Sequence, residues 1–88
     1  MEKIALITGA AGGLGRALAG ELAAEGWRLI VVSRDAGRLA EAFGTAHLQV
    51  EADCSSVAGV RTVFEVAAAH QLVPDALVRV VFDRGELT

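Results

Sequence analysis

The stretch LITGAAGGLGRALAGEL, residues 6–22, decides the fold of this chain. An apolar run leads into glycines at positions 9, 12, 13 and 15, and leucines at positions 14, 18 and 22 then recur on one helix face. This order predicts a buried strand, a tight turn and an amphipathic helix. A glycine-rich turn would let an anionic group reach the N–H groups and the positive dipole end at the helix N-terminus, because a glycine has no Cβ to block the approach.

The alternation of short apolar runs with helical segments continues along the chain. Strands are predicted at residues 4–7, 29–32, 48–52 and 76–82, with helices between them. Residues 48–52 alternate apolar and polar side chains, which indicates an edge strand with one exposed face. The pattern predicts an α/β fold: a Rossmann-like, three-layer parallel sheet truncated to about four strands in the order 3-2-1-4. Residues 1–88 would form one partial domain.

The predicted helices have recognisable ends. Asp35 is expected to cap the second helix and Gly44 to end it. Either Ser55 or Ser56 caps the third helix, and Pro74 ends the segment that follows. The third helix is predicted to be amphipathic, with an apolar stripe formed by Val57, Val60, Val63, Phe64 and Ala67.

Composition and charge restrict the classes of function. The chain has 88 residues, of which 53% are hydrophobic, and a formal net charge of −3, so at most one folded domain is expected. Acidic and basic residues are interspersed, which argues against a nucleic-acid or anionic membrane surface. No apolar run reaches the length of a membrane helix. The chain has one cysteine, without the spacing of metal ligands, which fits a reducing compartment. A cytoplasmic protein without a metal site is expected.

Residues 8–15, TGAAGGLG, match the pattern TGxxxGxG. They fit neither the GxGxxG spacing nor the Gly-Lys-Ser/Thr of an ATP-type phosphate loop. Here the sequence resembles the short-chain dehydrogenase/reductase family, whose cofactor loop is typically TGxxxGIG between the first strand and the first helix. The resemblance covers residues 3–78. It implies the N-terminal, cofactor-binding part of an NAD(P)-dependent oxidoreductase.

The resemblance also implies which residues would contact a dinucleotide. NAD-preferring members of the family place an acid at the end of the second strand, where this chain has Ser33-Arg34. An arginine suits the 2′-phosphate of NADP, because guanidinium binds phosphate bidentately, so NADP is expected over NAD. Asp53-Cys54 resembles the family's pair at the adenine ring, although Asp53 read alone is equally well a helix cap. The candidate cofactor-binding residues are Gly9, Ala11, Gly12, Gly13, Leu14, Gly15, Ser33, Arg34, Asp53 and Cys54.

The catalytic residues that the family would supply are not in this sequence. Family chemistry uses a Tyr-x-x-x-Lys pair with an upstream serine, whereas this chain has no tyrosine and its only lysine is Lys3. After Val78 the relatives continue with Asn-Asn-Ala-Gly, and this chain has residues 79–82, RVVF, instead. His47 and His70 lie in separate segments without a nucleophile at motif spacing, so they are interpreted as surface histidines. No catalytic residue is assigned, and the chain alone is expected to be inactive.

Three functional readings remain open at this point. The first is a cofactor-binding part of a short-chain dehydrogenase/reductase whose partner is the missing C-terminal half. The second is a non-catalytic nucleotide-binding module that forms a homo-oligomer through its fourth strand, where Val80, Val81 and Phe82 would offer an apolar edge. The third is a product that does not fold stably, because half a sheet leaves apolar faces bare.

Overall fold

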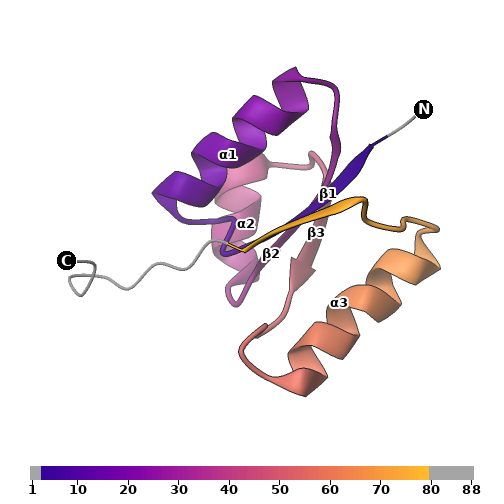
Figure 1. Cartoon of the computed structure of the whole chain (residues 1–88). Coiled ribbons are helices and arrows are strands. Elements are labelled where there is room, and N and C mark those ends of the chain that lie inside the picture. The colour runs from indigo at the N-terminus through magenta and orange to yellow at the C-terminus, as the bar shows by residue number, and fades with distance from the viewer. Residues whose placement is uncertain (1–2, 80–88) are drawn as a thin grey trace.

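Residues 3–79 of the chain are described by a computed structural model, in which four strands and three helices alternate (Figure 1). The elements, in chain order, are β1 (Ile4–Thr8), α1 (Gly13–Ala24), β2 (Arg28–Ser33), α2 (Ala36–Phe43), β3 (Leu48–Glu51), α3 (Val57–Ala69) and β4 (Ala76–Arg79). Each connection between consecutive strands of the chain therefore contains one helix. The predicted α/β class is confirmed.

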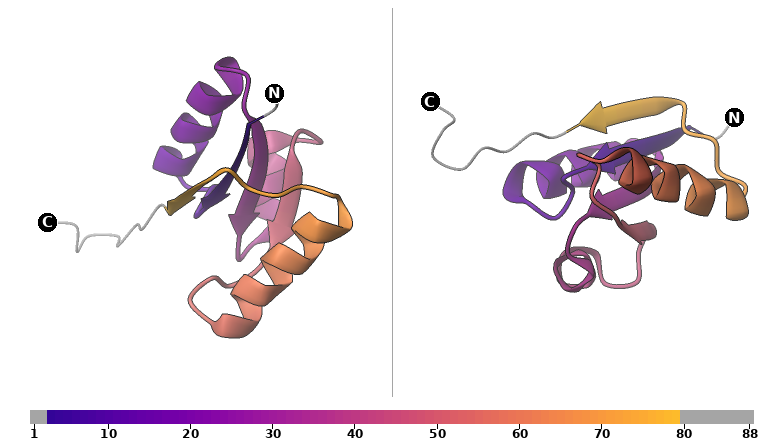
Figure 2. Two further views of the ribbon diagram at one scale, coloured as in Figure 1. Left: turned by 45° about the vertical axis from the view of Figure 1, so that its right-hand side comes forward. Right: turned by 90° about the horizontal axis from the view of Figure 1, so that it is seen from below.

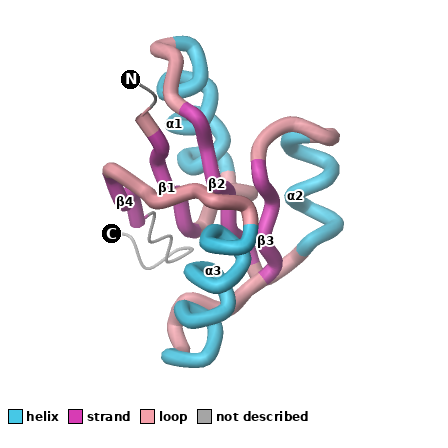
Figure 3. The backbone as a smooth tube through the Cα atoms, turned by 90° about the vertical axis from the view of Figure 1, so that its right-hand side faces the viewer, coloured by secondary structure: helices cyan, strands magenta, loops and turns pink. Residues whose placement is uncertain are grey.

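The four strands form one parallel sheet in the order β3-β2-β1-β4, and Figure 3 shows them side by side in this order. Thr8, the last residue of β1, lies opposite Val32 of β2 and Arg79 of β4. The carboxyl ends of these strands therefore lie at a common edge of the sheet. Ligands of open parallel sheets bind at this edge, where the strand order reverses direction next to β1.

The sheet separates two apolar clusters, because successive strand residues point to opposite faces. On one face Ile4, Ile30 and Val50 pack with Val63 and Ala67 of α3. On the other face the cluster is formed with α1 and α2 by Ala5, Ile7, Ala10, Ala11, Ala19, Leu29, Val31 and Leu39. Figures 1 and 2 show α1 and α2 on one side of the sheet and α3 on the other. The structure thus has the three layers that the sequence predicts.

The ends of β1 and β4 that are remote from this edge are joined by a short polar contact. Asp75 donates its N–H to the carbonyl of Ile4 (2.7 Å), and its carboxylate accepts a hydrogen bond from the Ile4 N–H (2.9 Å). One residue therefore satisfies both backbone groups of Ile4 and aligns the start of β4 with β1. The predicted strand at residues 76–82 begins at the expected residue, and its last three positions, Val80, Val81 and Phe82, lie outside the described residues.

On two helices, some residues of the predicted apolar face are exposed in the structure. Val63 and Ala67 of α3 are buried, but Val57 is 76% exposed, Phe64 is 48% exposed and Val60 is 38% exposed. The apolar stripe of α3 is wider than the part of the helix that the described sheet covers, so its remaining residues face outward. Leu14, at the start of α1, is 60% exposed for a different reason, because it lies in the first helical turn beyond the end of the sheet.

Helix α3 also ends several residues before Pro74, the residue that ends this segment in the sequence-based prediction. The helix ends at Ala69, Gln71 has a positive φ of 60°, and Leu72 donates its N–H to the carbonyl of Ala67 (2.9 Å). This closed turn ends the helix before Pro74 is reached and returns Leu72 to the apolar cluster under α3. None of the helices among residues 3–79 is both long and apolar enough to cross a membrane.

Candidate functional site

The glycine-rich loop connects β1 to α1 at the carboxyl edge of the sheet. Gly9 has a φ of 68°, a conformation that side chains with a Cβ rarely adopt, and this reverses the chain directly after β1. Ala10 then donates its N–H to the carbonyl of Val32 (3.0 Å), which ties the loop to the end of β2. The loop is therefore held by the backbone of the neighbouring strand.

Gly15 is required by close packing within this loop. A Cβ at Gly15 would overlap the carbonyl oxygen of Gly9 and would lie 2.7 Å from the Cα of Ala10. The first turn of α1 can therefore rest directly on the start of the loop. Gly15 and Ala11 are both buried, and Ala11 belongs to the apolar cluster under α1 and α2.

The N-terminus of α1 opens toward solvent from the same loop. Gly12 is the N-cap, and the helix begins with a hydrogen bond from the Arg16 N–H to the Gly12 carbonyl (2.9 Å). The preceding N–H groups, on Gly13, Leu14 and Gly15, therefore have no partner within the helix. Gly13 and Leu14 are exposed, and a Cβ placed on Gly13 would meet nothing within 4 Å. A ligand carrying negative charge has room to approach these donors and the positive end of the helix dipole.

The end of β2 presents Arg34 next to this loop. The Ser33 hydroxyl accepts a hydrogen bond from the Asp35 N–H (3.2 Å), and the Asp35 carboxylate accepts one from the Arg38 N–H (3.1 Å) and caps α2. Asp35 thus caps the helix that the sequence assigns to it. These bonds shape the turn in which Arg34 lies, and the Arg34 side chain is exposed.

The end of β3 presents Asp53 on the far side of β2. The carboxylate of Asp53 accepts hydrogen bonds from the hydroxyl (2.6 Å) and the N–H (2.9 Å) of Ser55. These two bonds, together with the positive charge of Arg34, hold the pKa of Asp53 below its usual value, against a smaller opposing effect of burial. Of these effects, the charge of Arg34 is the smallest.

Asp53 does not cap α3, which settles an alternative left open by the sequence. The N-cap is Ser56, whose hydroxyl accepts the Gly59 N–H (3.0 Å). Ser55 is engaged instead with the Asp53 carboxylate. Cys54, the next candidate residue, is partly buried and packs against the cluster under α3.

Sequence reasoning missed Gly59, which positions the Asp53 segment. A Cβ at Gly59 would overlap the carbonyl oxygen of Asp53 and would lie 2.5 Å from its carbonyl carbon. The first turn of α3 therefore packs directly on the backbone of Asp53. The sequence did contain a signal for this role, because a glycine inside a helical pattern often allows close packing against another segment.

The structure thus brings the glycine loop, Ser33-Arg34 and Asp53 to one edge of the sheet. The ends of β2 and β3 are joined there by a hydrogen bond from the Ala52 N–H to the Ser33 carbonyl (2.9 Å). Exposed backbone donors, the Arg34 guanidinium and the Asp53 carboxylate lie along this edge. The arrangement can bind an elongated ligand with a phosphate group near α1 and further polar groups toward β2 and β3.

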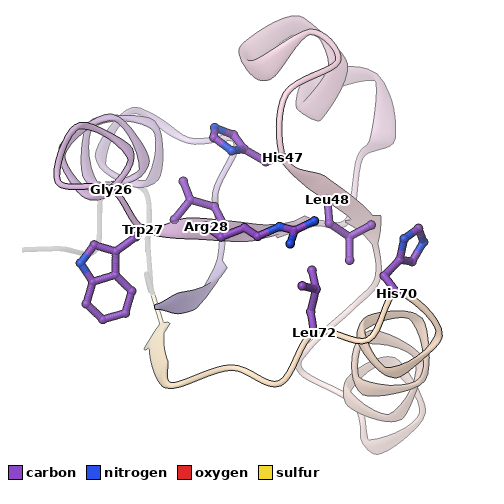
Figure 4. Close-up of a pocket in the computed structure, with 8 residues that line it drawn as sticks. Gly26, Trp27, Arg28, His47, Leu48, His70 and Leu72 are labelled. Atoms are coloured by element: carbon purple, nitrogen blue, oxygen red, sulfur yellow. The ribbon is translucent and has the colours of Figure 1, made fainter. Parts of the chain in front are cut away.

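A separate pocket of about 600 Å³ lies at the opposite, amino-terminal edge of the sheet (Figure 4). Its lining comprises Gly26, Trp27, Arg28, Leu29, His47, Leu48, His70 and Leu72. The two histidines, which the sequence leaves in separate segments, therefore border one pocket. His47 has a positive φ of 66° and contacts the Phe43 ring edge-on (5.6 Å between centroids). Its partial burial lowers its pKa, because burial disfavours the charged imidazolium.

Comparison with known proteins agrees with this architecture. Residues 3–81 match the family model described as short chain dehydrogenase. The chain is 39% identical over 79 residues to a Streptomyces violaceoruber protein described as ketoacyl reductase 2 of the granaticin polyketide synthase. That alignment covers 85% of this chain and 31% of the relative.

Solved structures show the same likeness in three dimensions. The 3-ketoacyl-(acyl-carrier-protein) reductase of Brucella melitensis, solved with NADH, is 36% identical with a TM-score of 0.77, over 85% of this chain and 32% of that one. The RhlG/NADP active-site complex of Pseudomonas aeruginosa is 29% identical with a TM-score of 0.83, over 92% and 35%. The chain thus spans about a third of the length of these relatives.

Proposed function

Because this chain belongs to the short-chain dehydrogenase family, we propose that it binds a nicotinamide dinucleotide at the carboxyl edge of its sheet, with NADP(H) preferred over NAD(H). The observation that carries the proposal is the loop at residues 9–15. Close packing at Gly15 fixes the backbone of the loop, and the space at Gly13 is open. The first N–H groups of α1 are therefore accessible to a ligand in a fixed arrangement. The pyrophosphate of the dinucleotide would lie against Gly13, Leu14 and Gly15.

The preference for NADP(H) rests on Arg34. This residue follows β2 at the position where an acid would hold the ribose 2′-OH of NAD, and its side chain is exposed. A guanidinium there favours the 2′-phosphate, which an acid would repel. Arg34 and Asp53 follow the neighbouring strands β2 and β3, so the pair would define the adenosine end of the site. Two solved relatives carry NADH and NADP respectively, so family membership supports the dinucleotide and leaves the preference to Arg34.

The experiment that tests this proposal is a fluorescence titration of the purified chain with NADPH and NADH, with folding monitored by circular dichroism in the same sample. Arg34→Gln should weaken NADPH binding by roughly tenfold or more and change NADH binding much less, since it removes a charge-assisted pair with the 2′-phosphate. Arg61→Gln is the matched control, because Arg61 is an exposed arginine on α3. Equal losses for both cofactors would refute the role of Arg34, and a folded chain that binds neither would refute the site.

The proposed role is binding and not catalysis by these 88 residues alone. The sequence contains no tyrosine, and its lysine, Lys3, directly precedes β1 at the edge of the sheet remote from the glycine loop. We therefore propose that hydride transfer requires further residues, supplied by a C-terminal half or by another chain. In the alternative, a non-catalytic module, the same site would bind nucleotide without chemistry, and the described part of β4 pairs only with β1. Sedimentation at several concentrations separates a monomer from a homo-oligomer joined at β4.

A further inference from the structure

Helix α2 begins next to the adenosine end of the proposed cofactor site, and a carboxylate caps its N-terminus. Asp35 is the N-cap, and its Oδ1 accepts a hydrogen bond from the Arg38 N–H (3.1 Å). The Asp35 N–H donates to the Ser33 hydroxyl (3.2 Å), so hydrogen bonds fix the turn around Arg34. The Asp35 carboxylate is therefore held in place one residue after the guanidinium that is proposed to bind the 2′-phosphate.

The N-termini of α1 and α2 differ in the charge that they present to a ligand. Gly12 caps α1 without a side-chain hydrogen bond, so the positive end of the α1 dipole carries no anion of the chain. Asp35 places a full negative charge at the positive end of α2. Because the dipole contributes only about half a positive charge there, the sum is negative. The N-terminus of α2 would therefore repel a phosphate, whereas the N-terminus of α1 would attract one.

Arg34 and Asp35 are both exposed, so a ligand that reaches one of these side chains is also subject to the charge of the other. Charges at the surface act on one another over a distance of about 10 Å at 0.1 M salt. Gly37 gives the carboxylate room in its capping position, because a Cβ at Gly37 would lie 3.2 Å from Asp35 Oδ1. The first turn of α2 thus keeps a negative charge beside Arg34.

From this geometry we propose that Asp35 is a specificity-determining residue that opposes Arg34. Its carboxylate repels the 2′-phosphate of NADP(H) and so limits the preference that Arg34 confers. NAD(H) has a neutral hydroxyl in place of that phosphate, so the carboxylate does not repel it. For exposed charges about 5 Å apart, the repulsion corresponds to about a threefold change in affinity at low salt. The inference rests on the proposed cofactor site.

The test is a fluorescence titration of the full chain and its variants with NADPH and NADH at low salt, with folding followed by circular dichroism. Asp35→Asn removes the charge and keeps a capping oxygen, since asparagine and aspartate are equally good N-caps. It should bind NADPH at least about threefold more tightly than the parent chain does, and NADH no more tightly. Glu41→Gln is the matched control, because it removes the same charge from an exposed position about 9 Å further along α2. It should leave both affinities nearly unchanged.

Salt separates an effect of charge from an effect of shape. The gain in NADPH affinity should largely disappear at about 1 M salt, where the Debye length is about 3 Å. A gain that persists there, or an equal gain for NADH, would overturn the proposal. Asp35→Ser also keeps a capping oxygen without a charge, and it should show the same gain if Asp35→Asn fails to fold.

The same titrations distinguish failure of this inference from failure of the cofactor site. NADPH binding that depends on Arg34 and is unchanged in Asp35→Asn would refute the role of Asp35 alone. A folded parent chain that binds neither cofactor would refute both the cofactor site and the role of Asp35.

Discussion

Two glycines of the loop at residues 9–15 lie close together and meet different physical requirements. Gly15 lies against the backbone of Gly9 and Ala10, so its lack of a side chain is a packing requirement. Gly13 has open space where a Cβ would be, so the folded chain itself does not require glycine there. In the proposed cofactor site, glycine at that position would let a ligand approach the helix N-terminus.

Gly15→Ala and Gly13→Ala separate these two requirements. Gly15→Ala should lower the free energy of unfolding by about 1–3 kcal/mol, because the loop or α1 must move to accommodate the methyl group. Gly13→Ala should change stability by less than about 1 kcal/mol and should weaken dinucleotide binding. Urea unfolding followed by circular dichroism, with NADPH titrations of both variants, provides the measurement. If Gly13→Ala binds NADPH as well as the parent chain does, the pyrophosphate does not lie against Gly13.

Asp53 permits a prediction about pH. Its pKa is lowered first by the Ser55 hydroxyl, so its charged form is favoured by folding. The associated stability is present above the usual pKa of an aspartate and is lost as the pH falls through the lowered value. Ser55→Ala should move the titration midpoint of Asp53 upward, toward its usual value, which carboxyl ¹³C NMR can follow. Thr62→Ala removes a hydroxyl that donates to the Ala58 carbonyl (3.0 Å) and should leave the Asp53 midpoint unchanged. An unmoved midpoint in Ser55→Ala would show that another group lowers this pKa.

At the scale of elements, α3 shows which features its sequence could predict. Its amphipathic pattern and a serine cap are correctly predicted, but the choice between Ser55 and Ser56 depends on the Asp53 carboxylate, which engages Ser55. The width of the apolar stripe in the sequence does not predict how much of the stripe packs against the sheet. Val63 is 1% exposed and Phe64 is 48% exposed although they are adjacent in the same stripe.

Val63→Ala and Phe64→Gln test which face of α3 is packed. Val63→Ala should reduce the free energy of unfolding by about 2 kcal/mol, because it opens a cavity between α3 and the sheet. Phe64→Gln should cost less than about 1 kcal/mol, since that side chain is half exposed. Urea denaturation of the two variants gives both values. A larger loss for Phe64→Gln would mean that in solution this face is covered by something beyond residues 3–79.

At the scale of the whole molecule, the two edges of the sheet carry different groups of residues. The carboxyl ends of the strands carry the glycine loop, Arg34 and Asp53, and the amino ends carry the pocket bordered by Arg28, His47 and His70. Parallel strands place every carboxyl end on the same side, so this separation follows from topology. Occupation of the proposed cofactor site would stabilise the whole folded chain, because that site requires several elements in their native positions.

Cofactor binding should therefore raise the stability of the entire chain. At a free NADPH concentration 100 times its Kd, binding to the folded state alone adds about 2.7 kcal/mol, and the thermal midpoint should rise accordingly. NADH at the same concentration should give a smaller rise, and the difference should largely disappear in Arg34→Gln. Thermal unfolding followed by circular dichroism makes this comparison. A midpoint that NADPH leaves unchanged would contradict the cofactor site even if the chain folds cooperatively.

The sequence alone determined the order of elements, the parallel sheet, the cap at Asp35 and the family pattern at residues 8–15, because these depend on local periodicity and spacing. Only the tertiary structure decided that Gly15 and Gly59 are packing residues and that His47 and His70 border one pocket. Each of these relations joins segments that are separated along the chain or depends on a backbone-to-backbone distance. Such distances arise when helices pack on the sheet, and no single segment contains them.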